Sequence, residues 1–167
     1  LSEDQALRFF LSYDGNRSIL PDFPLPGVAW WHRIDQALQY TVGIPFSSLT
    51  WTPAADWTVT FRYTLLLNVE LEVAWDVHEQ WQLFARFDNR YDAFTLETAR
   101  DHQRIFFQQR TVELGATWTP CDWAELSLAG GLAFDQEFET GFDTRDTTNV
   151  AEIDTGPFVR AKATVRF

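Results

Sequence analysis

Residues 67–75 read LNVELEVAW, and every second residue of this stretch is apolar. Successive side chains of an extended strand point to opposite faces of a sheet. One face of this strand would therefore be apolar, and the other would carry two carboxylates, Glu70 and Glu72. Such period-2 alternation is typical of a β-strand, whereas apolar positions at helical spacing are hard to find in the chain.

The same alternation recurs from the middle of the chain to its end, at 57–63, 81–91, 111–118, 124–134 and 159–167. Phe84 and Asn89 are the exceptions in the second of these stretches. Near Pro45 the phase slips, which predicts a bulge within one strand because proline removes a ladder donor. The pattern predicts eight antiparallel strands, at 5–13, 38–52, 57–64, 67–76, 81–91, 104–118, 123–138 and 155–167.

The length and composition of the chain limit its possible fold and function. The 167 residues suit a single domain, and the formal net charge of −11 argues against binding to a nucleic-acid backbone. The lone cysteine, Cys121, has no partner for an internal disulfide. No stretch approaches the roughly 18 apolar residues of a membrane helix. Because the sequence contains no methionine, we expect the initiator and any signal peptide to lie outside it.

Tryptophan marks the expected turns. The segments WTPAADW, WDVHEQW and WTPCDW hold six of the eight tryptophans, namely Trp51, Trp57, Trp75, Trp81, Trp118 and Trp123. The connections at 89–104 and 135–154 are instead long and polar. Short turns at one end of a sheet and long loops at the other are typical of outer-membrane barrels.

Two folds account for the alternation. A sandwich or barrel in water buries its apolar face, but it gives tryptophan no reason to gather at one end. A transmembrane barrel turns its apolar face to lipid and its polar face inward, with tryptophan at the membrane interface. The sequence therefore predicts an all-β, antiparallel up-and-down transmembrane barrel over 1–167. A hairpin is expected near residue 65, because one strand from 57 to 76 would span roughly twice the apolar thickness.

Charged side chains at the polar positions would line the interior of such a barrel. They are Arg62, Glu70, Glu72, Arg86, Asp88, Arg90, Glu113, Glu125, Asp135, Glu137, Arg160, Lys162 and Arg166. In a narrow barrel they must form ion pairs, since an unpaired ion in a low-dielectric interior is costly. The alternative is a selective pore, in which the cations of the last strand form a basic ladder facing acidic strands.

The pattern of histidines and carboxylates does not indicate catalysis. His32, His78 and His102 lie far apart and outside any metal-binding spacing, which predicts a protein that is no enzyme and has no cofactor or bound metal. The acidic segment 143–154 lacks EF-hand spacing, so a solvated loop is expected there rather than a divalent-cation site. The proline-rich segment 19–31 is expected to be an ordered extracellular or lumen-plugging loop.

The end of the chain resembles the C-terminal strand signal of Gram-negative outer-membrane β-barrels. Its apolar residues alternate up to a final aromatic one: Val159, Ala161, Ala163, Val165 and Phe167. From about residue 42 onward, GIPFSSLTWTP, the tryptophan-framed turns and the acidic loop are similar to an uncharacterised family of such barrels. This resemblance implies contact with outer-membrane lipid and lipopolysaccharide, and with the barrel assembly machinery. It also implies that the chain is the C-terminal part of a larger barrel.

The expected function is that of a non-enzymatic outer-membrane protein, either a passive pore for small solutes or a structural or surface-binding protein. The alternative is a soluble barrel or sandwich that binds an apolar ligand inside. The direction of the side chains separates the two. In the membrane interpretation Leu71, Leu114, Leu128 and Val165 point outward, and Glu72, Glu113, Glu125 and Arg160 point inward; the soluble interpretation reverses both sets.

Overall fold

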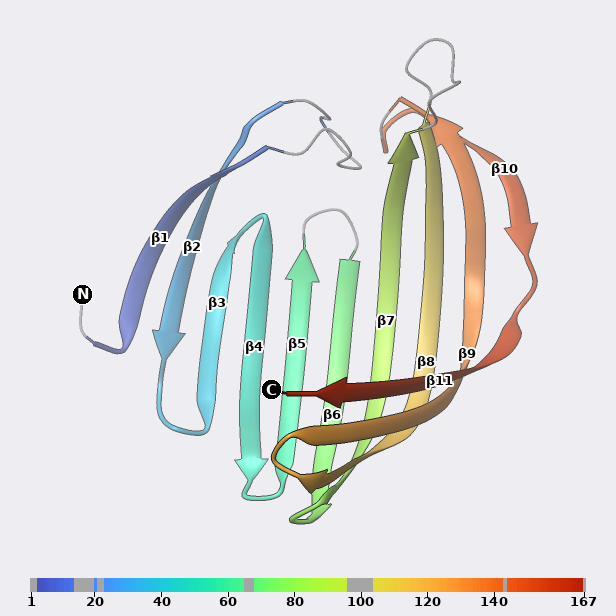
Figure 1. Cartoon of the computed structure of the whole chain (residues 1–167). Helices are drawn as coiled ribbons and strands as arrows, with labels where there is room; N and C mark the ends of the chain where they lie inside the picture. The colour runs from blue at the N-terminus through green and yellow to red at the C-terminus, as the bar shows by residue number, and fades with distance from the viewer. Residues whose placement is uncertain are drawn as a thin grey trace.

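The computed structural model describes residues 3–13, 20, 23–64, 68–95, 104–142 and 144–166. These residues form one antiparallel sheet, as Figure 1 shows. Its eleven strands are β1 (Gln5–Ser12), β2 (Leu25–Arg33), β3 (Leu38–Ile44), β4 (Phe46–Ala54), β5 (Trp57–Thr64), β6 (Asn68–His78), β7 (Trp81–Thr95), β8 (Arg104–Cys121), β9 (Ala124–Gly141), β10 (Thr147–Ile153) and β11 (Gly156–Val165). The predicted all-β, antiparallel up-and-down fold is confirmed. The described residues hold no helix that is long and apolar enough to cross a membrane.

Each strand from β1 to β9 pairs with its neighbours in the sequence. The end of the chain departs from this order, because β10 and β11 both pair with β9. β10 lies along 136–141 and β11 along 124–133, so the two form one interrupted edge strand. No pairing among the described residues joins β1 to this edge, and the sheet is therefore open.

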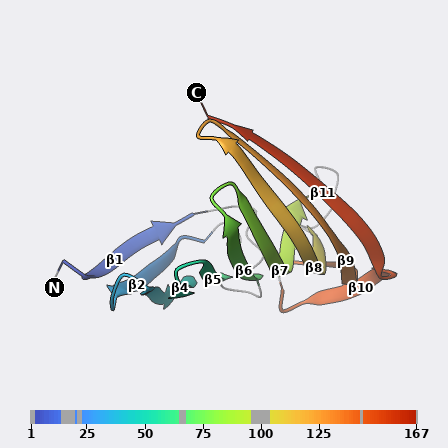
Figure 2. The same ribbon diagram turned by 90° about the horizontal axis from the view of Figure 1, so that it is seen from below.

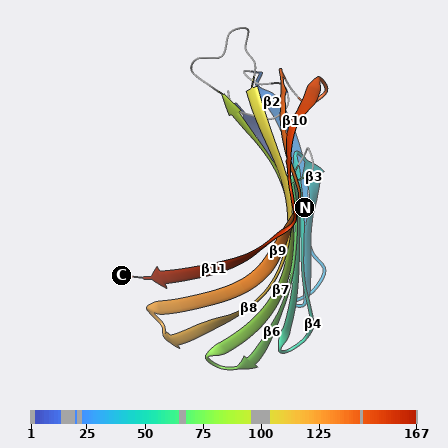
Figure 3. The same cartoon turned by 90° about the vertical axis from the view of Figure 1, so that its right-hand side faces the viewer.

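The sheet is a single curved layer with a concave and a convex face. Seen from below, the strands follow an arc, and β11 turns back over the concave side (Figure 2). In the side view the lower parts of β8, β9 and β11 bend toward that same side (Figure 3). This curvature leaves little interior, and the two buried apolar clusters are small: Ala74, Phe84 and Ala129 in one, and Tyr91, Ala93 and Phe106 in the other.

The prediction of eight strands is wrong in three places. Residues 38–52 are a hairpin of β3 and β4 that reverses at Pro45, with Thr41 opposite Ser48, rather than one bulged strand. Residues 25–33 form β2 rather than a loop. Pro26 is tolerated there because it pairs only with β1, while pairing with β3 begins at Val28. Finally, β10 lies within the expected loop 135–154.

The expected hairpin of β5 and β6 is confirmed by its register, which ends with Thr64 opposite Asn68. The expected long loops are shorter than predicted, because β7 continues to Thr95 and β9 to Gly141. These extensions escaped the sequence pattern because they are rich in polar residues on both faces, which reads as a loop. The three tryptophan-framed turns, β4–β5, β6–β7 and β8–β9, share one end of the sheet (Figure 1).

Candidate functional site: a charged concave face and an apolar convex face

A network of ion pairs crosses the concave face, with the Glu113 carboxylate at its centre. The Glu113 side chain is 1% exposed, and its Oε1 accepts hydrogen bonds from Arg86 at 2.7 Å and from Arg160 at 3.3 Å. Arg86 also pairs with Glu72 on the neighbouring strand. The network thus joins β6, β7, β8 and β11, and it pairs the buried Glu113 carboxylate through its Oε1 atom.

Arg160 reaches Glu113 across an intervening strand because β9 carries only small residues on this face between Ser127 and Ala133. Ala129 lies opposite Arg160 in the register, and Gly131 lies opposite both Glu113 and Phe158. A Cβ at Gly131 would lie 2.9 Å from the Glu113 Cβ and from the Phe158 ring. The glycine therefore leaves space in which side chains of β8 and β11 meet over β9.

Three further pairs lie on the same face, and the arginine side chain of each is exposed. Arg62 pairs with Glu70 at 2.7 Å, Arg90 with Asp88 at 2.9 Å, and Arg166 with Glu125 at 3.3 Å. Lys162 shares this face too, opposite Ser127, and has no ion-pair partner in the described part of the chain. The structure thus brings together most of the charged residues that the alternation places on one face.

Asp135 and Glu137 differ from the other charged residues. A bulge between β8 and β9, where Asp135 has φ 47°, shifts the phase of β9 by one residue. Asp135 consequently pairs with Arg110, and Glu137 lies opposite Gln108, on the face that the apolar residues occupy lower down. The prediction that both face the interior is wrong because alternation cannot be extended through a bulge.

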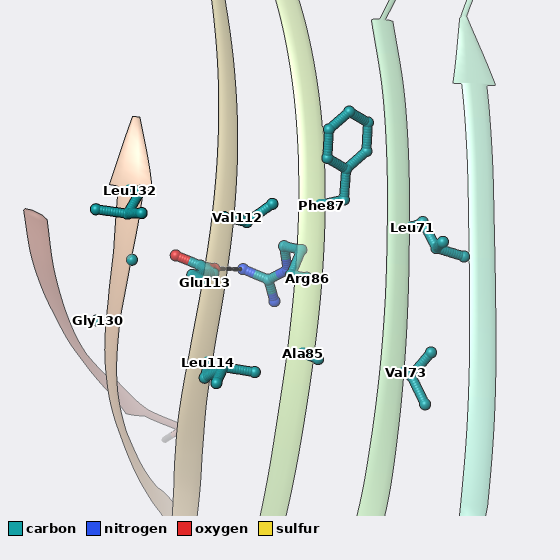
Figure 4. A pocket seen from close by; sticks show the side chains of 11 residues that line it. Leu71, Val73, Ala85, Arg86, Phe87, Val112, Glu113, Leu114, Gly130 and Leu132 are labelled. Carbon is teal, nitrogen blue, oxygen red and sulfur yellow. Dashed lines mark hydrogen bonds and ion pairs between the residues drawn. The ribbon is translucent and has the colours of Figure 1, made fainter. Parts of the chain in front are cut away.

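The convex face is an almost continuous apolar surface. Leu114, Leu128 and Val159 are 71%, 60% and 78% exposed, and Leu71 and Val165 are exposed as well. A shallow apolar groove of about 540 Å³ runs over β6–β9, where the small residues Ala85 and Gly130 lie between larger aliphatic ones (Figure 4). Val159, Ala161, Ala163 and Val165 continue this surface on β11, while Phe167 lies outside the described residues.

Aromatic residues border the apolar surface at the end of the sheet with the short turns. Trp57 stacks on Trp75 with centroids 5.6 Å apart, and Trp81 stacks on Trp118 at 5.9 Å. Trp51 and Trp123 lie in β4 and in the β8–β9 turn at the same end. All four stacked rings belong to the convex face, because they pair in register with one another and alternate with its aliphatic residues.

A polar cluster borders the apolar surface at its other end, and sequence reasoning missed it. Arg110 donates from Nε to Asn89 Oδ1 at 3.1 Å and also pairs with Asp135. Asn89 had broken the alternation of β7, which is the signal that marks this boundary. Trp81 and Asn89 mark the two borders on β7, and the strand between them is about 26 Å long. If the strand is tilted by roughly 40° from the barrel axis, the two borders are about 20 Å apart along that axis.

Beyond this boundary, the extensions of β7–β10 hold a buried tyrosine. The Tyr91 hydroxyl donates to Glu139 Oε2 at 2.7 Å, and its backbone N–H donates to Asn68 Oδ1 at 2.6 Å. Burial raises the pKa of Tyr91, and the bond to Glu139 and the charge of that carboxylate raise it further. Tyr91 therefore stays protonated and acts as a hydrogen-bond donor.

The remaining candidates do not gather into a site. His32 bonds Tyr40 through Nδ1 at 3.0 Å, His78 ends β6, and His102 lies outside the described residues. Among the described residues, no three His, Cys, Asp or Glu side chains are placed to hold a metal ion. The acidic segment 143–154 is largely β10, and Asp143 lies outside the described residues. Comparisons of the chain with protein families, curated proteins and solved structures found no match.

Proposed function

We propose that this chain is an outer-membrane β-barrel protein, or the part of one that carries the assembly signal, and that its concave face lines a path for small solutes. The distribution of side chains over the two faces carries this proposal. Exposed aliphatic residues cover the convex face, and the charged residues lie on the concave face. A soluble barrel places these two classes the other way round.

The borders of the apolar surface add support. Tryptophan pairs lie along one border and the Arg110 cluster along the other, about 20 Å apart at the tilt given above. That height approaches the ~25 Å apolar band of outer-membrane barrels, whose interfaces are marked by aromatic girdles. The open edges β1 and β10/β11 would be paired in a closed barrel, since an unpaired edge does not persist in lipid.

A second role, structural or surface-binding, is favoured by the ion pairs on the concave face, because paired charges can fill a narrow interior and block flow. Heat-modifiable migration of the detergent-refolded protein on a gel, with conductance recorded in planar bilayers from the same sample, separates the roles. We expect a mobility shift with stable current steps. A shift without current would support the structural role, whereas solubility in plain buffer without a shift would contradict the membrane proposal.

A further inference from the structure

The concave face has a cavity of about 440 Å³ below the Glu113 network. Two cross-strand rows form most of its lining. The first row is polar and runs from Gln82 through Thr117 and Ser127 to Lys162, each opposite the next in the register. The second row supplies an apolar wall, the buried Phe84 and Ala129, and ends on Arg160. This volume falls in the range of pockets for small ligands.

The charges around the cavity leave one cation without a counter-charge. Its three carboxylates, Glu72, Glu113 and Glu125, each pair with a guanidinium. Lys162 lines the cavity as well, and no described residue forms an ion pair with it. An ammonium group beside a partly enclosed cavity favours an anion there, because the effective dielectric is lower than in bulk water.

The neighbours of Lys162 are suited to a carboxylate. Ser127 lies directly opposite Lys162, and Thr117 lies opposite Ser127, so two hydroxyl groups can donate to the same anion. Phe84 and Ala129 form the adjoining wall and offer apolar contact to a short hydrocarbon group. The first row is therefore suited to the charged group of a ligand, and the second row to a small apolar group of the same ligand.

We propose that this cavity binds a small organic monoanion, a carboxylate that carries a short apolar group. The carboxylate accepts hydrogen bonds from the Lys162 ammonium and the Ser127 hydroxyl, and the apolar group contacts Phe84. The site belongs to the concave face whether or not the convex face contacts lipid. Only the idea that the site binds solutes on their way through the barrel rests on the proposed function.

Calorimetric titration with sodium benzoate tests the binding, in detergent or in plain buffer, whichever keeps the protein folded. Benzamide, which has the same shape without the charge, is the ligand control. We expect saturable benzoate binding that is about tenfold weaker in Lys162→Gln, the loss of one charge-assisted hydrogen bond. Arg8→Gln makes the same charge change on β1, outside the cavity, and should bind as the parent chain does.

Two results would overturn the proposal: equal binding of benzamide and benzoate, or equal loss in both variants. Lys162 is the only lysine of the chain, which allows a test that needs no variant. Benzoate should slow reductive methylation of Lys162, followed by peptide mass spectrometry, while the α-amino group reacts at its usual rate. Equal methylation with and without benzoate would also overturn the proposal. The gel shift, scored on the same sample, reports separately on the membrane proposal.

Discussion

At the scale of single residues, Glu113 decides how the concave face holds together. It is the most deeply buried charge of the ion-pair network, and two guanidinium groups on different strands bind the same carboxylate oxygen. Arg86 also lies over the Phe84 ring, and Arg160 over the Phe158 ring. These aromatic contacts restrict the motion of both cations, which lowers the entropy lost on pairing.

Replacement of this carboxylate should destabilise the sheet. We expect Glu113→Gln to lower the free energy of unfolding by about 2 kcal/mol, because it leaves two partly buried guanidinium groups without their shared counter-charge. Glu70→Gln removes one partner of a more exposed pair and should cost under about 1 kcal/mol. Denaturant unfolding of both variants checks this. Equal effects would mean that burial does not strengthen the Glu113 pairs.

Tyr91 predicts a pH dependence with a definite sign. Its pKa in the folded chain is raised above the ordinary value of 10.0, so folding favours the protonated form. The contribution of its hydroxyl to stability is complete below about pH 10 and is lost as pH rises through the raised pKa. Tyr91→Phe should therefore cost about 1 kcal/mol near pH 8 and progressively less in stronger alkali. Unfolding midpoints that fall in parallel with pH would contradict this.

At the scale of the strands, glycine and aromatic residues on adjacent strands fix the packing of the concave face. Phe84 of β7 lies over Gly115 of β8, where an added Cβ would come within 2.3 Å of the Phe84 ring and 2.8 Å of the Ala129 Cβ. Phe158 covers Gly131 in the same manner. Each ring fills the space that a missing side chain leaves, so the strands curve closely around small residues.

A pair of glycine variants tests this packing. Gly115→Ala should lower the free energy of unfolding by about 1–3 kcal/mol, the usual cost of overpacking a filled site. Gly130→Ala is the matched control, because a Cβ there would have only one neighbour, the Phe158 carbonyl oxygen at 3.9 Å. Unfolding curves of the two variants should differ clearly. A neutral Gly115→Ala would show that Phe84 can move away without loss.

The strands could be predicted from the sequence wherever one face is apolar and the other polar, as in β5, β6 and the lower parts of β7 to β9. β2 was missed because Pro26 and Gly27 resemble loop residues, although both lie where β2 is paired on one side only. β10 was missed because its polar residues occupy both faces. Phe84 disturbed the alternation for a reason that needs three dimensions, namely the small residue opposite it.

At the scale of the whole molecule, the sheet has an apolar convex face and a charged concave face. Apart from Asp135 and Glu137, the sequence predicted which charged residues share a face, but not which charges meet. Arg160 and Glu113 are not on adjacent strands, so their contact depends on curvature and on Gly131, neither of which alternation reports. The open edges likewise depend on how many strands an arc of this curvature requires.

A lysine on the convex face should separate the two environments proposed for it. Leu114 lies midway between Trp118 and Arg110 on β8, so Leu114→Lys should lower folding stability in lipid vesicles by about 2–4 kcal/mol. Val150→Lys is the control, since Val150 is 62% exposed on β10, beyond the polar border. Denaturant titrations in vesicles check both. Equal, small effects would place Leu114 in water.

The two stacked tryptophan pairs also give the sheet a spectroscopic signal of its strand pairing. Their indole planes are nearly parallel, at 7° for Trp57–Trp75 and 16° for Trp81–Trp118, and each pair bridges two neighbouring strands. Chromophores held this close exchange excitation, so each pair should give an exciton couplet in the circular dichroism of the indole bands. Trp75→Phe should remove one couplet and Trp118→Phe the other. The two signals would then report separately when β5 pairs with β6 and when β7 pairs with β8 during assembly.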